Sequence, residues 1–177
     1  MRQITTRYID HRKQTDVREI LPDPAEEDRE LLLVNLYPQV KYQSFIGFGG
    51  AFTDAAGYVF QQMPKALQDE VAKAYYSPQG LGYSLGRTTL DSCDFSLNCY
   101  DSLGGREDRT LSCFDVNRAA QYTVPLMKNA QEACGQSIPM MLTPWSPPAW
   151  MKTNGERVHG GEIKPECRGL WAEYICR

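Results

Sequence analysis

Three side chains with complementary chemistry lie at or just after the ends of predicted strands. Arg87 is near the end of a predicted strand over 82–88, and Asp94 lies just beyond it. Trp145 follows a second predicted strand over 138–143. Ligands of parallel α/β folds bind at the carboxyl ends of the strands. A carboxylate and a guanidinium can hydrogen-bond hydroxyl groups, and an indole can cover the apolar face of a sugar ring. The pattern therefore favours a carbohydrate ligand.

Trp145 has two interpretations from the sequence alone. It stands between Pro144 and the segment Ser146-Pro147-Pro148, whose prolines restrict the backbone around it. A tryptophan held in this way can serve as a rigid platform for a ligand. The alternative is an ordinary core tryptophan, and the residues leave both open.

The sequence lacks the motifs of other kinds of catalytic and cofactor-binding site. The run 47–50 does not fit GxGxxG, and no GxxxxGK[ST] or GxSxG occurs. Only His11 and His159 could assist a nucleophile or a metal, and the six cysteines form no CxxC pair. We therefore expect no nucleotide, metal or other cofactor, and we interpret the glycines at 47–50 as a sharp turn where a strand ends.

Charge and hydropathy exclude two classes of partner. The chain carries 19 Lys and Arg against 22 Asp and Glu, a net charge of −3, without a basic cluster. This disfavours nucleic acid and anionic membrane surfaces. No apolar run approaches the roughly 20 residues of a membrane span. Residues 1–13 lack the apolar core of a secretory signal, so we expect a cytoplasmic protein with reduced cysteines.

The sequence predicts a boundary near residue 40, with a small β region before it and alternating strands and helices after it. Strands are expected at 4–9, 31–36, 45–48, 82–88 and 138–143, with 41–48 as an extended hairpin segment. Helices are expected from Pro64 to about Ser77, from Asp115 to Gly135 with a kink at Pro125, and at about 165–175. Alternating strands and helices indicate βαβ units with a parallel sheet.

Three segments carry a resemblance to a known family. QSFIGFGGAFTDAA at 43–56, SCDFS at 92–96 and PWSPPAWMKTNG at 144–155 closely resemble glycoside hydrolase family 30. Within that family the chain is most similar to the glucosylceramidase and β-glucosidase branch. The resemblance implies a (β/α)8 TIM barrel flanked by a small β-sandwich. The expected fold is therefore α/β: residues 1–40 would form strands of the sandwich, and 41–177 the first three βα units of the barrel.

The resemblance also implies an activity, the hydrolysis of β-linked glucosides or related glycosides by double displacement. Such retaining enzymes use two carboxyl groups about 5 to 5.5 Å apart, one as acid/base and one as nucleophile. In the family the acid/base glutamate lies in an Asn-Glu-Pro motif, which is absent here. We assign neither catalytic glutamate to this sequence, and we expect the polypeptide to be inactive alone. The alternative is a non-catalytic sugar-binding fragment.

What carries over from the family is one side of the sugar site. Asp94 matches an aspartate that hydrogen-bonds sugar hydroxyls, and Trp145 matches a tryptophan that lines the same subsite. Arg87 matches an arginine that orders the active-site carboxylates, although a purely structural role remains open. Asp54 and Trp150 are assigned to the scaffold.

Overall fold

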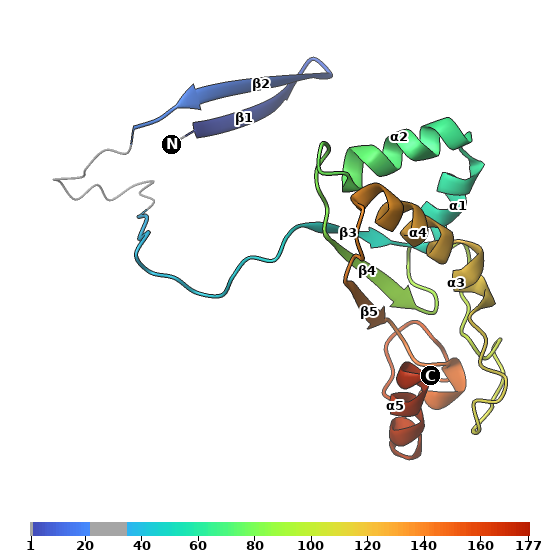
Figure 1. Ribbon diagram of the computed structural model, residues 1–177. Coiled ribbons are helices and arrows are strands. Elements are labelled where there is room, and N and C mark those ends of the chain that lie inside the picture. The colour runs from blue at the N-terminus through green and yellow to red at the C-terminus, as the bar shows by residue number, and fades with distance from the viewer. Residues whose placement is uncertain (1, 22–34) are drawn as a thin grey trace. The chain divides into compact units, whose positions relative to one another are not determined.

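The computed structural model describes residues 2–21 and 35–177, and the chain divides into two compact units, Met1–Gln43 and Ser44–Arg177. In the first unit, strands β1 (Arg2–Ile9) and β2 (Arg12–Glu19) form an antiparallel hairpin (Figure 1). Asp10 and His11 form its two-residue turn with positive φ angles of 49° and 60°, as a type I′ turn requires.

This hairpin only partly agrees with the sequence prediction. The strand expected at 4–9 is confirmed, but β2 lies between the strands expected at 4–9 and 31–36, where no strand was predicted. Its side chains are mostly charged or polar and all are exposed, so no buried apolar face marked it as a strand. Residues 31–34 of the expected strand at 31–36 lie outside the described residues.

In the second unit, three parallel strands form a sheet in the order β3-β4-β5. The strands are β3 (Gly49–Phe52), β4 (Leu85–Leu90) and β5 (Met140–Pro144). The intervening helices are α1 (Asp54–Gln62), α2 (Lys65–Tyr76), α3 (Asn117–Gln121) and α4 (Thr123–Cys134). Figure 1 shows α1, α2 and α4 gathered beside this sheet. The predicted βαβ arrangement is therefore observed.

The first parallel strand begins four residues later than predicted. No strand forms at 41–48, and the glycines at 49 and 50 are part of β3 rather than a turn after it. A Cβ on Gly49 would collide with the carbonyl of Leu85 on β4. Gly49 therefore allows close backbone approach between neighbouring strands, a use of glycine that the sequence prediction did not consider.

The helix predicted from 115 to 135 is two helices that meet at Tyr122. Pro125 causes no interior kink, because it lies in the first turn of α4, where a backbone N–H has no helical partner. Gly135 does close the helix in the left-handed conformation, with φ 75°. The sequence prediction missed α1, whose N-cap Thr53 accepts a hydrogen bond from the Ala56 N–H at 3.2 Å.

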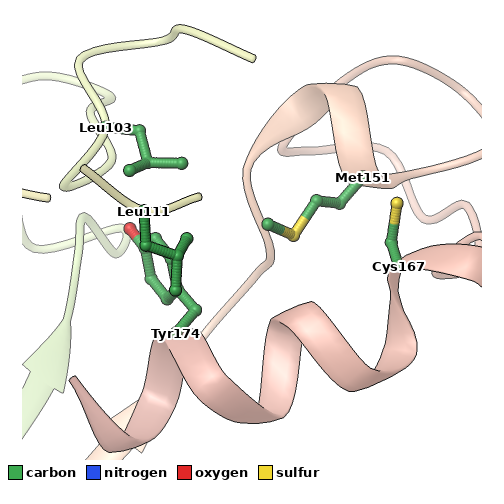
Figure 2. Close-up of a cluster of buried hydrophobic side chains, with 5 residues drawn as sticks. All are labelled: Leu103, Leu111, Met151, Cys167 and Tyr174. Carbon is green, nitrogen blue, oxygen red and sulfur yellow. The ribbon is translucent and has the colours of Figure 1, made fainter. Parts of the chain in front are cut away.

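Two buried clusters hold the second unit together. Phe52, Ala130 and Ile138 pack between the sheet and α4. The other cluster joins the long segment after β4 to the C-terminal helix α5 (Arg168–Cys176), and consists of Leu103, Leu111, Met151, Cys167 and Tyr174 (Figure 2). It fixes the loops that follow the strands. No helix in the described part of the chain has the length and apolarity that a membrane span requires.

Candidate functional site

Arg87 of β4 contacts Trp145, which directly follows the neighbouring strand β5. Because β4 and β5 are parallel, their carboxyl ends lie at the same edge of the sheet. The Arg87 guanidinium lies 5.2 Å from the centroid of the Trp145 ring, and its Nε donates a hydrogen bond to Thr143 Oγ1 at 3.0 Å. Trp145 is 50% exposed. It is therefore an open aromatic surface with a cation against it, not a core tryptophan.

Asp94 and Trp145 line one hollow of about 390 Å³, which we call the Asp94–Trp145 hollow. Its walls are formed by Ser92, Cys93, Asp94, Ser96, Asn98, Cys99, Trp145, Ser146, Arg157 and Val158. Asp94 is exposed, and its carboxylate makes no hydrogen bond or ion pair within the described residues. Its oxygens are free to accept hydrogen bonds from a ligand.

Arg87 does not belong to the walls of this hollow. It contacts the Trp145 ring but lines a separate, mostly apolar hollow of about 570 Å³ on the sheet, together with Ile46 and Met141. The structure thus brings Asp94 and Trp145 together around one space, while Arg87 supports the indole. This geometry favours the structural role left open for Arg87.

A buried carboxylate at the start of α1 holds the segment that carries Asp94. Asp54 is 1% exposed, and its Oδ2 accepts a hydrogen bond from the Leu97 N–H at 3.0 Å. The Arg118 guanidinium donates to both Asp54 oxygens at 2.9 Å. The Ala55 N–H also donates to the Phe95 carbonyl at 3.1 Å. Asp54 therefore belongs to the scaffold, as predicted. Its contact with Leu97 helps to hold the segment that carries Asp94 in place.

A second buried carboxylate, Asp91, lies between β4 and Asp94 and anchors the start of the segment that carries Asp94. Its Oδ1 accepts hydrogen bonds from the Ser102 N–H at 2.9 Å and hydroxyl at 2.7 Å. Its Oδ2 accepts from the Tyr174 hydroxyl at 2.6 Å and from Arg157 at 3.2 Å. Burial, followed by the hydrogen bond to Asp91, raises the pKa of Tyr174 well above its ordinary value. The phenol therefore remains a donor to this carboxylate.

Sequence reasoning missed both Asp91 and Arg157. An acidic residue directly after the apolar end of a strand, as in Leu90-Asp91, was an available signal for Asp91. Arg157 stands in a loop that carried no recognisable motif. Among the described residues, no group of three or more His, Cys, Asp or Glu side chains could hold a metal ion, and all six cysteines are free.

Residues 45–176 match the model of the glycosyl hydrolase family 30 TIM-barrel domain. The chain belongs to this family. The resemblance inferred from the three sequence segments is thus confirmed, and the parallel sheet and helices of the second unit are part of a TIM-barrel domain.

Relatives and solved structures agree with this assignment. A putative glucosylceramidase 4 of Caenorhabditis elegans is 38% identical over 77% of this chain and 27% of its own length. The lysosomal acid glucosylceramidase of Mus musculus is 33% identical over 82% of this chain and 29% of its own. SrfJ from Salmonella typhimurium has a TM-score of 0.71 at 36% identity, covering 76% of this chain and 30% of its own. The chain thus spans less than a third of each of these proteins.

Proposed function

We propose that this chain is part of a retaining β-glycosidase and that the Asp94–Trp145 hollow is where it holds the sugar. One observation carries this proposal: a free carboxylate and an exposed indole line the same hollow beside the carboxyl ends of two parallel strands. The carboxylate can accept hydrogen bonds from hydroxyls, and the indole can cover the apolar face of the ring. The hollow of about 390 Å³ falls in the size range of small-ligand sites.

The substrate class follows from the relatives taken together. They include glucosylceramidases and an endo-1,6-beta-D-glucanase of Neurospora crassa that is 28% identical over 74% of this chain. Glucosylceramide and a β-1,6-glucan have only the β-linked glucosyl unit in common, so we infer that the common substrate is a β-linked glucoside. Asp94 would bind its hydroxyls, Trp145 would stack on its ring, and Arg87 would hold the indole in place.

Hydrolysis with retention needs two carboxyl groups about 5 to 5.5 Å apart. The described walls of the Asp94–Trp145 hollow contain one carboxylate, Asp94, and no glutamate. Six glutamates that follow β4 are interpreted as surface charges, and all six are exposed: Glu107, Glu132, Glu156, Glu162, Glu166 and Glu173. We therefore propose that the 177-residue polypeptide binds a glucosyl unit without hydrolysing it. In this proposal the chain comes from a glycosidase, and by itself it acts as the sugar-binding fragment that the sequence left open as the alternative.

A titration tests this function. Methyl β-D-glucopyranoside should quench tryptophan fluorescence saturably and release measurable heat in calorimetry, because a sugar stacked on Trp145 changes its surroundings. Asp94→Asn should weaken affinity about tenfold, the scale of one hydrogen bond to a charged group. Asp69→Asn, on the exposed surface of α2, is the matched control and should bind as the wild type does. The same preparation should leave 4-nitrophenyl β-D-glucoside intact.

Two results would contradict the proposal. Absence of any saturable response to the glucoside would remove the sugar site. Turnover of the aryl glucoside that survives repurification and is lost in Asp94→Ala would show that this polypeptide is itself catalytic.

We also infer that residues 1–40 contribute strands to a β-sandwich and that 41–177 belong to the barrel domain. Ile4 and Val17 are direct partners across the β1–β2 hairpin and are both more than half exposed. Partners across an antiparallel pair point to the same face. An exposed apolar pair of this kind is what a second sheet covers in a sandwich.

A further inference from the structure

Arg157 is a charged side chain built into the wall of the Asp94–Trp145 hollow. It lies in the loop after β5, and its side chain is only 7% exposed. Its NH1 donates to Asp91 Oδ2 at 3.2 Å and its NH2 donates to the Ser92 carbonyl at 3.4 Å. A guanidinium has five N–H donors, so these two bonds leave others for a ligand in the hollow.

Asp91 holds this guanidinium in one place. Its carboxylate is fully buried and is itself fixed by Ser102 and Tyr174, which come from elements outside the hollow. Tyr174 belongs to α5 and to the buried cluster of Figure 2, so the orientation of Arg157 depends on the packed core. A guanidinium held in this way loses little conformational freedom when it meets a ligand.

We propose that Arg157 contacts the sugar in this hollow and that Asp91 is its positioning residue. The inference rests on the proposed function and adds a hydrogen-bond donor to the sugar site. Asp94 offers acceptors, Arg157 offers donors and Trp145 offers an apolar surface, which together suit a ring whose hydroxyls both donate and accept. Because Asp91 neutralises the Arg157 charge, the site selects neutral hydroxyls over an anionic sugar.

Affinities of three variants for methyl β-D-glucopyranoside, measured by calorimetry, test the proposal. Arg157→Met should weaken binding about tenfold, and Arg157→Lys should recover part of that loss. Asp91→Asn should also weaken binding about tenfold, because the guanidinium is no longer fixed. Asp69→Asn is the matched control: it removes a carboxylate from an exposed ion pair with Lys65 on α2 and touches neither Arg157 nor Asp91, so affinity should change less than twofold.

Monodeoxy analogues of the glucoside separate a direct contact from a general loosening of the fold. The wild type should bind one of these analogues about tenfold more weakly than the parent, whereas Arg157→Met should bind that analogue and the parent equally. If Arg157 had only a structural role, Arg157→Met would lower the affinity for every sugar by the same factor. Methyl β-D-glucuronide should bind the wild type more weakly than the neutral glucoside.

Folding of the variants is followed by circular dichroism. If Arg157→Met unfolds because Asp91 is left buried without its cation, the double variant Asp91→Asn/Arg157→Met removes both charges and should fold and bind weakly. If the wild type binds the glucoside and the folded Arg157 variants bind it equally well, the inference about Arg157 is overturned and the proposed function stands. A wild type that binds no glucoside would overturn both this inference and the proposed function.

Discussion

Tyr76 and Tyr100 are phenols whose surroundings favour the neutral form. Burial, chiefly, raises the pKa of each to about 12 from an ordinary value of 10.0. Because the folded pKa exceeds the unfolded one, the stabilisation is complete below pH 10 and is lost as the pH rises toward 12. Urea unfolding between pH 9 and 12 should show this fall, and Tyr100→Phe should make it shallower. A tyrosinate absorbance titration in which Tyr76 and Tyr100 are half ionised near pH 10 with the fold intact would contradict it.

At the scale of single residues, the sequence was sufficient to find two of the side chains that line the Asp94–Trp145 hollow. Trp145 stands directly after β5, and Asp94 lies in the segment that follows β4. Both are within recognisable sequence segments, so their placement around one hollow could be predicted. Asp91 and Arg157 could not be found in this way. They are 66 positions apart, and their importance arises from an ion pair that exists only after the loops have packed.

At the scale of elements, two glycines in helices should respond oppositely to the same substitution. Gly57 of α1 is buried, and a Cβ there would collide with the Tyr122 carbonyl, whereas Gly169 of α5 has open space around it. Gly57→Ala should destabilise the fold by about 1 to 3 kcal/mol through overpacking. Gly169→Ala should stabilise it by up to about 1 kcal/mol through lower unfolded-state entropy. Urea unfolding measures the change in the free energy of unfolding for each variant. Changes of the same sign in the two variants would contradict the prediction.

Element types were more predictable than element boundaries. The helix after Pro64 and the C-cap at Gly135 were correct because proline and glycine act locally at helix ends. The shift of β3 to 49–52 and the break at Tyr122 depend on contacts with other elements. Gly49 joins a strand because Leu85 approaches it, which no local pattern indicates.

The whole molecule contains a parallel sheet with helices beside it, a pattern that the sequence predicted and that matches a TIM-barrel domain. Within the described residues, β3 and β5 each pair with one strand only, so each has an edge with free backbone groups. A barrel has no such edges, because its sheet closes on itself. The three-stranded sheet therefore leaves exposed the surfaces that a closed barrel covers.

These exposed surfaces should make the 177-residue polypeptide associate with itself. Met141 of β5 is 59% exposed and, with Ile46, lines the apolar hollow of about 570 Å³ on the sheet. Unpaired edges and contiguous apolar surface favour contact between copies. Sedimentation velocity should therefore show larger species as concentration rises. Met141→Glu, which places a charge on the edge strand, should reduce them, whereas Leu67→Glu on the surface of α2 should not. A single monomeric species at all concentrations, with a sharp cooperative melt, would show that this sheet is stable without further strands.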